Sequence, residues 1–243
     1  MSLVIAIKDK DRIVLGGDKQ TSAGNNKDHL ATKIWEVPGL PGAIMGGVGS
    51  FRASQIIQYV DLIDKNSLSN NLSIEWVVKY LAPTIYATLE ANGVNCTQGE
   101  EGFETRMMPN SFLFAYEDKA WMIWNDLSVT ELLDYMAIGS GADIARGVLF
   151  ATPDKNPFER IITAIDAAAE STVYVDDGVD VLLTKEKPTD AKQFAKALGI
   201  EIKKVEETAQ KIEEKQEAVE VEEEEKQKET TKKKKDKKEK IDN

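Results

Sequence analysis

Two nearly uninterrupted apolar segments open the chain, at residues 3–7 and 13–15, and they constrain its fold more than any other feature. Polar residues at 8–11 separate them, which indicates two strands joined by a turn. Strands that lack polar–apolar alternation are typical of sheets covered on both faces. The fold therefore has to place a further layer of structure on each side of this sheet.

Predicted strands and helices alternate along the rest of the body. Further strands are predicted at residues 42–45, 111–116, 119–124, 132–138 and 179–183. Helices are predicted to begin at Ser50, Ser73, Ser140 and Asn156, and the second is expected to kink at Pro83 and to end at Asn92-Gly93. Asp143 completes a capping box with Ser140, and Pro157 fits the first position of its helix. This order fits two stacked sheets with a helical layer outside each.

The chain is long enough for one sizeable domain, which we place at residues 1–186. A short amphipathic linker helix is expected at 187–202, and a Glu/Lys-rich tail at 203–243 is expected to be disordered or a solvated helix. The tail holds 13 lysines and 14 acidic residues, so most of the net charge of −11 belongs to the body. An acidic body argues against binding of nucleic acid.

Cysteine content and hydropathy exclude other classes of protein. The single cysteine, Cys96, excludes intramolecular disulfides and Cys-rich zinc sites. No apolar run is long enough to cross a bilayer, and no signal peptide precedes the first strand. The sequence therefore predicts a cytoplasmic protein with no membrane partner.

Ser2 is the candidate nucleophile. Removal of Met1 is expected because the second residue is small, and it would leave a free α-amine on Ser2. That amine titrates near pH 8, so one residue would carry both a hydroxyl nucleophile and a suitable general base. The only histidine, His29, lies in a polar stretch and is expected to be solvated. A hydrolase with this composition would need a base other than histidine.

Five short motifs follow one another along the chain: Ser2, Gly17-Asp18, Lys33-Ile34, Gly46-Gly47-Val48-Gly49 and Gly139-Ser140-Gly141. Each motif alone is unspecific, because Asp18 also fits a turn residue, Lys33 a surface lysine and Ser140 a helix N-cap. In this order and spacing, the five closely resemble the β-type subunits of the proteasome family. Within that family they are most similar to the bacterial HslV-type peptidases, over roughly residues 2–185.

The resemblance implies an α+β fold, the four-layer αββα sandwich of the N-terminal-nucleophile (Ntn) hydrolases. It also implies a catalytic role for Ser2 as nucleophile, for Lys33 as the cation beside its hydroxyl, and for Asp18 as the partner that holds Lys33. The backbone N–H of Gly46 would stabilise the oxyanion, with Gly47 as the alternative because the spacing is one residue longer than in the HslV pattern. Ser140 would help to orient the α-amine.

The sequence departs from the family at two places. The family's nucleophile is usually threonine, and Thr172 and Val175 stand where proteasome β subunits carry an Asp-x-x-Ser pair. HslV-type members also depart at that pair, and they can bind a structural cation through carbonyls of this loop, here near Ala169, Thr172 and Val175. No other cofactor is expected.

The resemblance further implies a peptide or protein substrate, a homo-oligomeric ring and an ATP-dependent unfoldase as partner. A peptidase is the preferred hypothesis. The alternatives are a peptide ligase or amidase on the same fold, and a catalytically silent ring-forming subunit.

Overall fold

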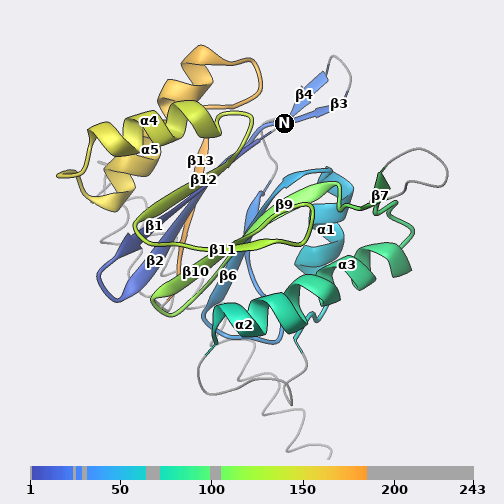
Figure 1. Ribbon diagram of the computed structural model, residues 1–243. Helices are drawn as coiled ribbons and strands as arrows, with labels where there is room; N and C mark the ends of the chain where they lie inside the picture. The colour runs from blue at the N-terminus through green and yellow to red at the C-terminus, as the bar shows by residue number, and fades with distance from the viewer. Residues whose placement is uncertain (1, 24–25, 29–31, 64–71, 99–104, 185–243) are drawn as a thin grey trace, which may run out of the picture. The chain divides into compact units, whose positions relative to one another are not determined.

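The computed structural model (Figure 1) describes residues 2–23, 26–28, 32–63, 72–98 and 105–184. These belong to one compact unit, Met1–Glu186. The linker helix expected at 187–202, the tail at 203–243 and His29 lie outside the described residues. No helix among the described residues has both the length and the apolar character needed to cross a membrane.

The first sheet contains the two apolar segments that open the chain. Its four strands are antiparallel to their neighbours in the order β12-β1-β2-β13. Strand β1 is central, pairing with both β2 and β12, and its residues 3–7 are fully buried, as are residues 13–15 of β2. The strands are β1 (Leu3–Asp9), β2 (Arg12–Asp18), β12 (Tyr135–Gly139) and β13 (Val179–Leu183).

The second sheet has five strands in the order β11-β10-β9-β6-β5. Its hairpin β9–β10 turns at the predicted place, where Glu117 adopts a φ of 55°. Its strands are β5 (Ile34–Glu36), β6 (Ala43–Gly49), β9 (Asn110–Tyr116), β10 (Lys119–Ile123) and β11 (Val129–Glu131). Two smaller antiparallel pairs are β3 (Thr21–Ala23) with β4 (Asn26–Asp28) and β7 (Thr97–Gln98) with β8 (Thr105–Arg106).

Three hydrophobic clusters define the layers of the unit. One joins the inner faces of the two sheets, for example Val4 and Leu15 with Ile44 and Leu113. A second packs the outer face of the first sheet against α4 (Ala142–Ala151) and α5 (Pro157–Ser171), seen together on one side of that sheet in Figure 1. The third covers the outer face of the second sheet with α1 (Phe51–Tyr59), α2 (Ile74–Trp76) and α3 (Ala82–Ala91). The result is an αββα sandwich, as expected.

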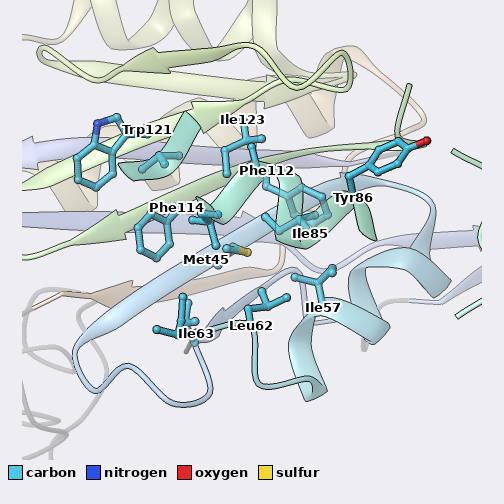
Figure 2. Packing of buried hydrophobic residues seen from close by; sticks show 14 of the residues in the cluster. Met45, Ile57, Leu62, Ile63, Ile85, Tyr86, Phe112, Phe114, Trp121 and Ile123 are labelled. Atoms are coloured by element: carbon cyan, nitrogen blue, oxygen red, sulfur yellow. The ribbon is translucent and has the colours of Figure 1, made fainter. Parts of the chain in front are cut away.

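The third cluster is rich in aromatic side chains. Phe114 and Trp121 from the β9–β10 hairpin stack with ring centroids 5.8 Å apart. Figure 2 shows them with Met45 of β6 in the layer that faces the helices. Met45 is fully buried here, which makes it part of the core.

The helices over the second sheet are interrupted at the predicted proline. α1 (Phe51–Tyr59) begins after Ser50, whose side chain accepts a hydrogen bond from Ala53 N. α2 (Ile74–Trp76) leads into a π-helical turn, η2 (Val77–Leu81), and then α3 (Ala82–Ala91). Because Pro83 has no N–H, the regular ladder cannot continue, and the wider turn precedes it. The end at Asn92-Gly93 is confirmed, with Gly93 at φ +74°.

Two local predictions differ from the structure. Ser140 does not cap α4, because the N-cap is Gly141 and no side chain bonds there, while Asp143 pairs with Arg146. The strand predicted at 132–138 corresponds to β12, which begins at Tyr135 and ends at Gly139. By contrast, Asn156 caps α5 as predicted, accepting a hydrogen bond from Glu159 N at 2.9 Å.

Candidate active site

A buried ion pair lies beside the first residue of β1. Asp18 ends β2, Lys33 immediately precedes β5, and the Lys33 Nζ donates to Asp18 Oδ1 at 2.6 Å. The two side chains are 0% and 4% exposed. Burial of two charges is unfavourable unless they are paired and hydrogen-bonded, so this geometry requires both partners.

Backbone donors complete the surroundings of the Asp18 carboxylate. Leu3 N donates to Oδ1 at 2.6 Å, while Gln20 N and Asp176 N donate to Oδ2 at 3.2 and 3.3 Å. Burial lowers the pKa of Lys33, and the negative charge of Asp18 opposes this shift. The carboxylate thus holds the lysine and also binds the start of the chain.

Ser2 is held in place through its own backbone. The Ser140 N–H donates to the Ser2 carbonyl at 2.8 Å, and the next residue, Leu3, is bound to Asp18. Gly139 makes this approach possible, because it adopts a φ of +106° and a Cβ there would lie 2.1 Å from Ser2 O. Ser2 itself is 8% exposed.

We expect Gly139→Ala to destabilise the protein by about 1–3 kcal/mol from backbone strain alone, with the collision against Ser2 added. Chemical denaturation measures the change in the free energy of unfolding. Gly147→Ala is the matched control, because Gly147 lies within α4 and a Cβ there meets no atom within 4 Å. The control should be neutral or stabilising by up to about 1 kcal/mol. Equal effects of the two substitutions would contradict the role given to Gly139.

A cavity of about 70 Å³ opens beside Ser2 and Lys33. The remaining lining comes from the residue before β3, the start of β3, the segment before β5, the end of β6, and α1. These residues are Gln20, Thr21, Thr32, Gly47, Gly49, Phe51 and Ser54. The structure therefore brings Ser2, Asp18 and Lys33 together at one cavity, since Asp18 bonds directly to Lys33.

The two candidate oxyanion donors differ in direction. Gly47 lines the cavity, and its N–H donates to Lys33 O at 3.0 Å, on the β5 side of the strand. Successive N–H groups along a strand point to opposite sides, so the Gly46 N–H is directed toward β9, where Gly46 pairs with Leu113. A Cβ at Gly46 would meet Val4 in the core between the sheets. This arrangement favours Gly47, although an oxyanion would have to share its N–H with Lys33 O.

The other predicted positions lie around this centre. Ser140 is exposed and meets Ser2 through its backbone N–H. Thr172 follows α5, and its N–H donates to Ala168 O, while Val175 is buried against the α4–α5 layer. Neither side chain takes the place of the missing Asp-x-x-Ser pair.

The loop expected to bind a cation borders an open hollow of about 710 Å³. Ala169, Thr172 and Val175 line it together with four acidic residues, Asp166, Glu170, Asp176 and Asp177. Burial, and to a lesser extent the neighbouring charge of Asp177, raise the pKa of Asp166. These surroundings fit a cation. Because no cluster of three potential metal-binding side chains exists among the described residues, backbone carbonyls would have to supply ligands.

Two residues of the site were missed from the sequence. Gln20 is 2% exposed, and its Nε2 donates to Val173 O at 3.0 Å, so it ties the 172–177 loop to the end of β2. Ser54 of α1 forms part of the cavity wall. Gln20 stands two residues after Asp18, which is the only signal that could have identified it, and Ser54 gave none.

Solved structures of other proteins share the fold of this chain. The structure matches BPH from Thiobacillus denitrificans, solved in complex with epoxomicin, with a TM-score of 0.58 and 19% identity over 76% of this chain and 100% of that one. It matches HslV from Trypanosoma brucei with a TM-score of 0.50 and 19% identity over 74% and 98% of the two chains. The chain has the proteasome-like Ntn-hydrolase fold.

A third similar structure is Anbu from Pseudomonas aeruginosa, solved as a helical assembly, with a TM-score of 0.53 and 15% identity over 81% and 94% of the chains. No protein-family model and no curated protein matches the sequence. At these identities the likeness establishes the Ntn-hydrolase fold alone. The chemistry has to be argued from the residues of this chain.

Proposed function

We propose that this protein is a serine-type N-terminal-nucleophile peptidase. The observation that carries the proposal is the buried Asp18–Lys33 pair at the cavity that Ser2 lines. A buried ion pair is weak evidence for stability, because a well-packed apolar pair is often as stable. The pair lies at the same cavity as a serine that could become N-terminal, where the Lys33 ammonium could stabilise negative charge on the serine oxygen.

In the proposed mechanism, removal of Met1 exposes the α-amine of Ser2. This amine takes the hydroxyl proton, directly or through a water, as Ser2 Oγ attacks the peptide carbonyl. The Oγ–C bond forms and the C–N bond breaks, and the amine passes the proton to the leaving group. Water then attacks the acyl ester, releases the second product and restores the hydroxyl.

Lys33 and the glycine segment stabilise charge in this scheme. The Lys33 ammonium, held by Asp18, favours the developing alkoxide on Ser2. The Gly47 N–H is the proposed oxyanion donor in place of Gly46, because Gly47 lines the cavity, and an oxyanion there would share this N–H with Lys33 O. Ser140 acts through its backbone N–H, which fixes the Ser2 carbonyl and with it the orientation of the residue.

Assembly and location are also part of the proposal. We infer that the protein forms a homo-oligomer that encloses its sites, acts on peptides or unfolded proteins, and works in the cytoplasm. The helical assembly of the Anbu neighbour supports an oligomer in general terms. A ring and an ATP-dependent unfoldase remain expectations from the resemblance.

Product analysis tests the reaction type. We expect a short peptide to give its two hydrolysis fragments, and an added amine acceptor to change the yield little, because water resolves the acyl-enzyme. Mass spectrometry of the products with and without the acceptor measures this. Transfer of most of the acyl group to the acceptor would instead identify a ligase. Release of no fragment under either condition would favour the catalytically silent subunit.

A further inference from the structure

The cavity beside Ser2 is lined by a buried hydroxyl, that of Ser54, which accepts a hydrogen bond but does not use its own donor among the described residues. Ser54 lies on α1 and is 6% exposed. Its Oγ accepts a hydrogen bond from Asn110 Nδ2 at 3.0 Å. The hydroxyl proton of Ser54 has no acceptor among the residues that the structure describes.

The orientation of Asn110 makes this assignment definite. Its Oδ1 accepts from Ser50 N at 3.0 Å, and its Nδ2 also donates to Ser50 O at 3.0 Å. With Oδ1 turned toward Ser50 N, the group that faces Ser54 is the amide donor. Asn110 is 1% exposed and is fixed by three hydrogen bonds, so it cannot turn to accept from Ser54 without breaking them.

Ser54 therefore has to direct its proton elsewhere, and the cavity that it lines is the open direction. A buried donor without a partner is unfavourable, which makes the site incomplete until an acceptor enters. Ser54 is thus set up to donate to a group that enters the cavity next to the nucleophile.

Size limits what can enter. The cavity measures about 70 Å³, whereas a cavity of about 150 Å³ is the size known to hold a benzene ring. Among the described residues, its walls are mostly small or polar, and Phe51, which is 43% exposed, is the one large apolar residue on them. Gly47 leaves little spare room, since a Cβ there would meet Ser54 Oγ at 2.9 Å.

From these observations we propose that the cavity selects substrates whose reacting residue has a short side chain with an oxygen acceptor, such as threonine or serine, and that Ser54 is the residue that reads this oxygen. The reacting residue is the one whose carbonyl Ser2 attacks. The inference rests on the proposed peptidase function and adds the substrate class to it.

Fluorogenic peptides that differ only at the reacting residue provide the test. Threonine and valine have nearly the same shape and differ in one hydroxyl, so their ratio of kcat/KM isolates the hydrogen bond. We expect threonine to be preferred by about five- to tenfold, as a net hydrogen bond implies. Phenylalanine should be cleaved at least about tenfold more slowly than threonine, because it does not fit.

Ser54→Ala should reduce the threonine-to-valine ratio to near one. The ratio is measured on a single enzyme preparation, so partial unfolding of the variant cancels. Ser128→Ala is the matched control, since Ser128 is exposed and its side-chain hydroxyl bonds to Asp126 on the surface, not at the cavity. It should leave the ratio unchanged.

The outcomes distinguish failure of the proposed selectivity from failure of the proposed peptidase function. Cleavage with a preference for phenylalanine, or a threonine-to-valine ratio that Ser54→Ala does not change, would overturn the selectivity and leave the peptidase intact. Absence of cleavage for every peptide, together with absence of a covalent adduct on Ser2, would overturn both.

Discussion

Ser2→Ala is expected to lower kcat for peptide hydrolysis by about 10⁴-fold or more, because it removes the only hydroxyl that the mechanism uses as nucleophile. Alanine is also small, so removal of Met1 should proceed as before, and the α-amine should remain. The backbone contacts that hold this residue, from Ser140 N to its carbonyl and from Leu3 N to Asp18, do not involve the hydroxyl. A steady-state assay on fluorogenic peptides measures the loss.

Ser2→Thr is the matched control for this substitution. Threonine keeps the hydroxyl and the amine and adds a methyl group that restricts the side-chain rotamer. Its activity should stay within about tenfold of the wild type. Undiminished hydrolysis by Ser2→Ala would place the nucleophile elsewhere, while equal loss in both variants with a normal fold would point to a steric effect.

Removing one partner of the Asp18–Lys33 pair is expected to have the largest effect on stability. Lys33→Met leaves a buried carboxylate without its cation, and Asp18→Asn leaves a buried ammonium without its anion. Substitutions of this kind destabilise by about 3–5 kcal/mol. Both variants should also be nearly inactive, because Lys33 no longer stabilises the Ser2 alkoxide. Denaturant unfolding gives the free-energy change for each.

The double variant Asp18→Asn/Lys33→Met separates the charge from the packing. It contains no unpaired buried charge, so its destabilisation should be clearly smaller than the sum of the two single effects. Additive effects would mean that the two side chains do not interact across the 2.6 Å contact. Lys79→Met is a control, since Lys79 forms an exposed pair with Glu75 on the surface of α2 and η2. It should change stability by less than about 1 kcal/mol.

Local sequence signals predicted most of the fold correctly, for identifiable reasons. The uninterrupted apolar residues of β1 and β2 required a sheet covered on both faces, and the structure supplies a second sheet on one face and α4 with α5 on the other. The Asn156-Pro157 and Asn92-Gly93 pairs marked helix ends because each has a specific backbone role. Signals of this kind act within a few residues and need no tertiary contact.

The features that the sequence did not predict depend on tertiary geometry. Serine is a residue type that often caps helices, yet the Ser140 N–H donates to Ser2 O, and the N-cap of α4 is the next residue, Gly141. The choice between Gly46 and Gly47 depends on which side of β6 each N–H takes, and this follows only from the pairing with β5 and β9. Ser54 and Asn110 are 56 residues apart, so no local pattern could indicate their contact.

The central claim is that Ser2 becomes an N-terminal nucleophile, and the intact mass of untagged protein before and after exposure to a peptide epoxyketone tests it most directly. This reagent requires a hydroxyl and a free α-amine on one residue, and the BPH neighbour was solved in complex with epoxomicin. A threonine-like reacting group on the reagent suits the proposed cavity. We predict the loss of Met1 and a single stoichiometric adduct located on Ser2. Retention of Met1 with no adduct would contradict the account and leave a protein that has the peptidase fold without its chemistry.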